Sequence, residues 1–237
     1  MTKKKEVAIK EENQLPAFML EDTDPTGFED MDADDFIIPR LKLVQKGSPE
    51  VDDSNAKYID GAKVGQMINT ATQELYDSLN VIPIKFTKNV VEWGPENNLV
   101  ATYEPGAVAS VDGEKNGKPI QIHPETGNEL VSTTYMYCLT ENGPIVIPFK
   151  STGIKVVRSW VTQARNIKGA HLYSFWWKLD VVTETSKVHS WRNYKVSKLD
   201  AVTLEQYTEA KDFLSSIEAG THKMADEEAE PTKERKF

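Results

Sequence analysis

The chain of 237 residues has one cysteine, Cys138, and lacks any long apolar segment. A single cysteine excludes a disulfide within the chain, and this fits a reducing compartment. A helix that spans a membrane would need a run of about 18 apolar residues, which the sequence lacks. Residues 3–5 are lysines followed by an acidic stretch, so we also expect no secretion signal. These absences predict a cytoplasmic protein without a membrane partner.

Motifs for catalysis, cofactors and metals are missing as well. The sequence has neither a GxxxxGK[ST] nor a GxGxxG phosphate loop, and its four histidines do not form an HExxH pair. Carboxylates concentrate towards the two ends of the chain, whereas a metal-dependent nuclease needs several of them converging in its folded core. We therefore expect no enzyme activity, no cofactor and no metal site.

The charges are distributed unevenly along the chain. The formal net charge of −9 argues against a nucleic-acid partner, because such proteins usually carry a positive balance. Residues 1–35 hold 4 basic and 11 acidic residues, whereas residues 145–198 hold 10 basic and 2 acidic residues. Residues 199–237 return to a net charge of −5. The basic middle could be an ordinary solvated surface, but it also contains four of the five tryptophans.

Alternating apolar residues predict a mainly β fold with two helices. Strands are expected over residues 37–44, 67–72, 79–87, 131–140, 145–150, 171–182 and 188–196. Pro83 predicts an edge or a bulge, and residues 105–129 predict an extended loop or a hairpin tip. Helical spacing covers residues 152–168, and a second helix should begin with a capping box at Thr203 and end at Gly220.

This order of elements suggests an OB-fold, in which a helix lies between the third and fourth strands of a small barrel. We predict a mainly β (α+β) protein with an OB-like barrel, one inserted helix and a C-terminal helix. Residues 36–218 would form this domain. Residues 1–35 would be a disordered acidic segment, and residues 219–237 would be a flexible acidic tail.

The helix expected over residues 152–168 has a basic side. At 100° per residue, Lys155, Arg158, Arg165 and Lys168 fall within an arc of about 140° that borders the apolar stripe. Cations beside a packed face can hold a phosphate chain against the domain. The alternative is an ordinary amphipathic helix with a solvated basic side.

Two strands carry tryptophan beside lysine on the face opposite their apolar residues. Trp176 and Lys178 share such a face in residues 171–182, and Trp191 and Lys195 share one in residues 188–196. If the two strands form a hairpin, both rings could lie near each other on one exposed surface, where bases can stack on them. The alternative is that both rings pack in the core, because tryptophan is usually largely buried.

The chain combines an acidic tail that ends in Phe237 with a strand-rich domain that has a basic, aromatic surface. In this combination it resembles phage-encoded single-stranded DNA-binding proteins. Its segments Ile38–Leu43, Val81–Ile84 and Ser159–Arg165 resemble those of tailed-phage proteins placed near that group. The resemblance implies an OB-fold that coats replicating or recombining DNA. It also implies a tail that contacts a phage DNA polymerase or helicase and competes with DNA. The matching tail residues are Asp226, Glu227, Glu228, Glu230 and Phe237, although Lys233, Arg235 and Lys236 dilute the tail's charge.

The function predicted from the sequence is therefore sequence-independent binding of single-stranded DNA in phage replication or recombination. Trp176 and Trp191 would stack on bases. The residues expected to contact phosphates are Lys150, Lys155, Arg158, Arg165, Lys168, Lys178, Arg192 and Lys195. One alternative is a phage protein-interaction or assembly module without catalysis, and another is an annealing protein. The oligomeric state, including a homo-oligomer, stays open.

Overall fold

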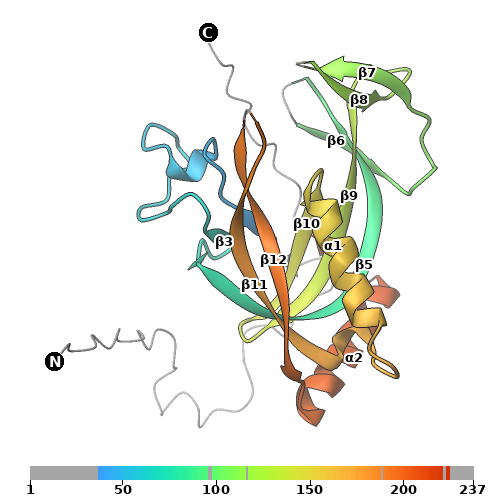
Figure 1. Ribbon diagram of the computed structural model, residues 1–237. Helices are drawn as coiled ribbons and strands as arrows, with labels where there is room; N and C mark the ends of the chain where they lie inside the picture. The colour runs from blue at the N-terminus through green and yellow to red at the C-terminus, as the bar shows by residue number, and fades with distance from the viewer. Residues whose placement is uncertain (1–36, 96–97, 116, 188, 221–222, 225–237) are drawn as a thin grey trace, which may run out of the picture.

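The computed structural model describes residues 37–95, 98–115, 117–187, 189–220 and 223–224 (Figure 1). Most of this part of the chain is β-structure with two α-helices, so the predicted mainly β class is confirmed. Residues 1–35, predicted to be disordered, lie outside the described residues. The tail residues proposed to bind a partner, Asp226, Glu227, Glu228, Glu230 and Phe237, also lie outside them.

Two long antiparallel strands form the centre of an eight-stranded sheet. They are β5 (Ser78–Trp93) and β9 (Glu129–Thr140). Strand β10 (Gly143–Lys150) forms a hairpin with β9, as the alternating pattern predicted. Strand β11 (Phe175–Thr185) pairs with the first part of β5, and β12 (Ser190–Ala201) pairs with β11 at the edge of the sheet.

The far ends of β5 and β9 carry three shorter strands. They are β6 (Leu99–Tyr103), which pairs with β5, and the hairpin of β7 (Val111–Lys115) and β8 (Lys118–Ile122), which pairs with β9. This hairpin lies where the sequence predicted an extended loop or a hairpin tip. The ladder between β5 and β9 shifts register between Pro83 and Lys85, which confirms the predicted bulge.

Smaller sheets surround this frame. Strands β2 (Leu41–Leu43), β3 (Met67–Asn69) and β4 (Leu75–Tyr76) form a three-stranded sheet. Strand β1 (Ile37–Ile38) pairs in parallel with β13 (Lys223–Met224). Short 3₁₀ turns occur at η2 (Pro49–Val51) and at η3 (Leu172–Ser174), so the strand predicted from residue 171 begins only at residue 175.

Both predicted helices are present. Helix α1 (Gly153–Arg165) follows β10, and helix α2 (Leu204–Ala219) follows β12. The capping box of α2 between Thr203 and Gln206 forms as predicted, and Gly220 ends the helix in the left-handed conformation, with φ of 74°. Apolar residues at helical spacing predict that Leu204, Tyr207, Ala210, Leu214 and Ile217 form the packing face of α2. This prediction is wrong at Leu204, which is 83% exposed. Phe213 is buried instead.

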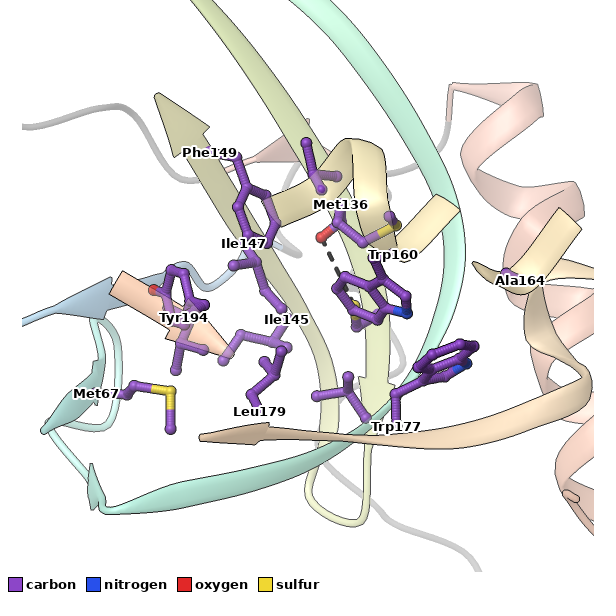
Figure 2. Packing of buried hydrophobic residues seen from close by; sticks show 14 residues of the cluster. Met67, Met136, Ile145, Ile147, Phe149, Trp160, Ala164, Trp177, Leu179 and Tyr194 are labelled. Carbon is purple, nitrogen blue, oxygen red and sulfur yellow. Dashed lines mark hydrogen bonds between the residues drawn. The ribbon is translucent and has the colours of Figure 1, made fainter. Parts of the chain in front are cut away.

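One core lies between α1 and the sheet (Figure 2). Trp160 and Ala164 of α1 pack in the same cluster as Trp177 and Leu179 of β11, and the Trp160 and Trp177 ring centroids are 6.0 Å apart. Cys138 is fully buried in this cluster, and burial raises the pKa of its thiol. A buried, protonated thiol is a core residue and a poor nucleophile.

A second core lies on the opposite face of the sheet, beneath α2. Tyr135 and Tyr137 of β9 belong to it, whereas Met136 between them belongs to the first core. Ala210 and Phe213 are the buried residues that α2 contributes. The sheet is therefore covered by a helix on each face, so neither face of its central part is free.

The described strands do not close into the predicted OB-like barrel. The sheet ends at β12, whose ladder partner among the described strands is β11. The segment that holds β1 and β2 contacts the edge strands β10 and β12 without forming a continuous ladder with either among the described residues. Arg40 forms an isolated parallel bridge with Val146 of β10, and the Gln45 side chain bonds the Arg192 backbone of β12. Helix α1 contacts both β10 and β12 and covers the gap between these two edges.

Candidate nucleic-acid interface

Helix α1 presents a basic side to solvent. Lys155, Arg158 and Arg165 are exposed, whereas Trp160 and Ala164 are among its buried residues. The helix contains no acidic residue, and none of these three cations forms an ion pair within the described part of the chain. Lys168 is also exposed, but it lies in the turn after the helix ends. The predicted basic side of the helix is thus present.

A shallow pocket lies between α1 and the edge strand β12. Its volume is about 280 Å³. Four of its lining residues come from the helix and two from the strand: Lys155, Val156, Ser159, Gln163, Lys195 and Val196. Two lysines from different elements therefore meet at one pocket that no carboxylate lines. Its polar side chains are donors suited to an anion, and its valines are apolar.

Lys178 has a partner within its own strand. Its Nζ lies 2.9 Å from Asp180 Oδ1, and both side chains are partly exposed. Asp180 is also the residue directly opposite Lys195 in the ladder. The carboxylate of Asp180 therefore offsets part of the positive charge on this face, and Lys178 is a weaker candidate for a phosphate contact than Lys155.

Two other predicted cations have different surroundings. Lys150, at the end of β10, places its Nζ 4.5 Å from the centroid of the Trp93 ring. Arg192 donates from Nη1 to the Thr183 hydroxyl, and its guanidinium lies against Gly65. The residues that line the pocket include neither of them, so the eight predicted cations do not form one continuous row.

Trp176 does not have the exposed position that was predicted. It does lie on the face opposite the first core, but α2 covers that face. Its ring packs in the second cluster, and its Nε1 donates to Gln206 Oε1 at 3.1 Å. The side-chain alternation of the strand was correct, and the error arose because both faces of this sheet are buried.

Trp176 and Trp191 also lie far apart. Trp191 is opposite Glu184, near the hairpin turn, whereas Phe175 and Trp177 pair with residues at the other end of β12. Eight residues separate Trp176 from Glu184, which corresponds to about 26 Å at roughly 3.3 Å per residue. Both rings lie on the same face of the sheet but far apart along the strands, so the prediction that they lie near each other on one exposed surface is wrong.

Trp191 retains a partly exposed ring. Its Nε1 is buried and has no hydrogen-bond partner among the described residues. Trp191 and Lys195 lie on the same face of β12, about 13 Å apart along the strand at roughly 3.3 Å per residue. Both predicted stacking residues are partly buried, and Trp191 is the one that belongs to neither core cluster.

The sequence prediction missed three residues at this interface. Ser159 and Gln163 line the pocket as neutral donors, and Gln45 holds the edge of β12 through two hydrogen bonds. The spacing of Ser159 and Gln163 on one side of α1 could have indicated the first two. No local signal points to Gln45, because its partner Arg192 is 147 residues away in the chain.

A buried carboxylate lies elsewhere, at the base of the β7–β8 hairpin. Glu92 is 1% exposed and accepts hydrogen bonds from Thr126 at 2.6 Å, Tyr103 at 2.5 Å and Asn128 at 2.7 Å. The bonds from Thr126 and Tyr103 are the main reason that the pKa of the Glu92 carboxyl is below its usual range, while burial opposes them. This network connects β5, β6 and the turn before β9.

Within the described ranges, no group of three or more His, Cys, Asp or Glu side chains is placed to hold a metal ion. No helix in that part of the chain is long and apolar enough to cross a membrane.

Comparison with known proteins identifies a phage family. The family model described as Pam3 phage gp34-like protein matches residues 9–223. This match covers most of the chain, which therefore belongs to the Pam3 phage gp34-like family. No curated protein and no solved structure is significantly similar to the chain.

Proposed function

We propose that this member of the Pam3 phage gp34-like family binds single-stranded nucleic acid along α1 and β12. The observation that carries the proposal is the pocket at which Lys155 and Lys195 meet without a lining carboxylate. Exposed Arg158 and Arg165 extend the positive charge along the helix, and Trp191 adds an aromatic ring on the strand. Cations that follow the phosphates, together with a ring for stacking, are the usual means of binding a single strand.

Charge distribution also supports this location. The chain as a whole is acidic, at −9, but α1 contains three cations and no carboxylate. A phosphate chain approaching this side meets exposed cations without ion-pair partners among the described residues, so binding would release counterions. These phosphate contacts are independent of sequence and fit a role in coating DNA during phage replication or recombination.

The test is a titration of a labelled oligothymidylate at low and high salt. If Lys155, Arg158, Arg165 and Lys195 contact phosphates, log affinity should fall against log salt with a slope near −3, at about −0.7 per phosphate on a single strand. Lys155→Glu and Lys195→Glu should each weaken binding roughly tenfold. Lys118→Glu, an exposed lysine on β8 outside this face, is the matched control. A slope near zero, or equal losses in all three variants, would contradict the proposal.

An acidic protein partner is the second candidate for the same face, because exposed lysines and arginines also fit carboxylates. Binding of an acidic phage or host protein would make the chain an interaction or assembly module without catalysis. If the wild-type protein fails to bind any oligonucleotide at low salt while remaining folded, this second candidate replaces the first.

A further inference from the structure

The pairing of β12 with β11 determines which residues of this edge strand have outward-facing backbone groups. In an antiparallel ladder, alternate residues turn both backbone N–H and C=O away from the paired strand. Arg192 N–H donates to Gln45 Oε1, and Gln45 Nε2 donates to Arg192 O, both at 2.9 Å. Tyr194 N–H donates to its neighbour, Asn193 Oδ1, at 2.9 Å. Residues 192 and 194 therefore face outward, away from β11.

The hydrogen bond of the hairpin turn between β11 and β12 independently identifies the same outward-facing residues. Ser186 N–H donates to His189 O at 2.7 Å, so this pair is hydrogen bonded across the turn. From this turn, hydrogen-bonded and non-hydrogen-bonded pairs alternate along the ladder. The pair of Thr183 and Arg192 is therefore non-hydrogen-bonded, and so is the pair of Leu179 and Val196, four residues further along. The register does not shift between these pairs. Val196 therefore also faces outward.

Val196, whose backbone groups face outward from β11, is one of the residues that line the pocket between β12 and α1. Val196 and Lys195 line it from the strand, and Ser159 and Gln163 line it from the helix. Gln45 satisfies the outward groups of Arg192, and Asn193 satisfies the N–H of Tyr194. The next outward residue, Val196, receives no such bond from the described residues. A donor and an acceptor on one residue are therefore available at the pocket.

Gln45 shows what chemistry such a pair accepts. Its primary amide places a donor next to an acceptor in one plane, and it bonds the C=O and the N–H of one edge residue. Thymine and uracil carry the same arrangement in their N3–H and adjacent carbonyl, and guanine carries it in N1–H and O6. Single-stranded bases expose these edges to proteins.

We infer that the pocket receives one nucleobase, whose amide edge pairs with the N–H and C=O of Val196. Lys155 and Lys195 then contact the phosphates on either side, and Val156 packs against the base. The volume of about 280 Å³ lies just below the roughly 300–1,000 Å³ of pockets for drug-sized ligands, which suits a single nucleotide. The inference rests on the proposed function and adds a preference among bases to it.

The first arm of the test changes the ligand and leaves the protein intact. Three labelled oligomers of about 12 nucleotides, within the 4–16 nucleotides that such sites cover, are titrated into the full chain. They contain thymine, N3-methylthymine or uracil. Methylation at N3 removes the donor of the amide edge and should lower affinity about tenfold or more. Uracil lacks only the C5-methyl group, on another edge, and should bind within about twofold of thymine.

The second arm changes the strand. Val196→Pro removes the outward N–H without removing a ladder bond, and proline is tolerated at such edge positions. It should lower affinity for the thymine oligomer roughly tenfold and erase the difference between thymine and N3-methylthymine. Lys198→Pro, at the next outward residue and outside the pocket lining, is the control and should keep that difference.

The outcomes separate the two proposals. The base pocket is supported if affinity falls for the N3-methylthymine oligomer but not for the uracil oligomer, and if Val196→Pro lowers affinity for the thymine oligomer. Equal affinity for all three oligomers overturns the base pocket and leaves nucleic-acid binding standing. If no oligomer binds the folded wild-type chain at low salt, the proposed function and the base pocket are overturned together. The ligand arm decides the question even if Val196→Pro does not fold.

Discussion

Helices α1 and α2 cover opposite faces of one sheet and differ in charge and in how they are held. Helix α1 has three cations and no carboxylate, whereas α2 has four carboxylates and one lysine. Helix α1 buries four residues, including Trp160, and has no side-chain cap; α2 buries two residues and has a capping box at Thr203. Packing of buried side chains therefore stabilises α1 and leaves its charged side chains exposed. The stability of α2 depends more on the hydrogen bonds at its ends.

This difference separates the two tryptophans that were predicted to stack on bases. Trp176 lies beneath the acidic helix α2, where phosphates would be repelled, and Trp191 lies on β12, the strand that contacts the basic helix α1. The same residue type on neighbouring strands thus has a structural role in one position and a proposed binding role in the other.

The largest expected effect is on the packing of α1. Trp160→Ala removes a fully buried ring that contacts Trp177 and Phe149, and should reduce the free energy of unfolding by about 3–5 kcal/mol. Urea denaturation followed by circular dichroism measures this loss. Trp191→Ala, which removes a partly exposed ring, should cost about 1 kcal/mol or less. Similar losses in both variants would mean that packing does not hold α1.

The second prediction compares the charges of the two helices. Reversing two exposed cations of α1, in Arg158→Glu with Arg165→Glu, should weaken binding of oligothymidylate about 100-fold, or about 2.7 kcal/mol. Lys211→Glu makes α2 still more acidic and should change affinity by less than about twofold, because that face is already repulsive. Fluorescence anisotropy at fixed salt gives both values. A larger loss from Lys211→Glu would reverse the assignment of the binding face.

The third prediction concerns the tryptophan beneath α2. Trp176→Ala removes a half-buried ring and its hydrogen bond to Gln206, and should destabilise the protein by about 2 kcal/mol. Because the ring does not reach the basic face, affinity for oligothymidylate should be unchanged. Trp191→Ala should show the opposite pattern, with weaker binding by about 1–3 kcal/mol if one base stacks on the ring. Loss of binding in Trp176→Ala would contradict its structural role.

Local features of this fold were predictable from the sequence, and contacts between distant segments were not. The helical spacing of α1, the capping box at Thr203 and the bulge at Pro83 each depend on a few neighbouring residues, and all three are present. Trp176 is covered by α2, where its hydrogen-bond partner Gln206 is 30 residues away in the sequence. The packing face of this helix was itself predicted partly wrong.

The edge of the sheet shows the same limit. Alternation predicted which residues of β12 share a face, but not that α1 would lie beside this strand or that the sheet would stay open there. The pocket depends on both facts, because it combines residues of α1 with residues of β12. The sequence therefore predicted Lys155 and Lys195 as separate phosphate contacts, and only the structure shows that both residues line one pocket.

The smallest expected effect tests the caps. Thr203 accepts a hydrogen bond from Gln206 N–H at the start of α2, whereas Thr152 makes no such bond at the start of α1. Thr203→Ala should reduce stability by about 1 kcal/mol, and Thr152→Ala should change it by less than about 0.5 kcal/mol. Hydrogen exchange should show faster exchange confined to α2 in the first variant, because few buried contacts hold this helix once its first turn frays. Equal losses in the two variants would show that α2, like α1, is held by packing alone.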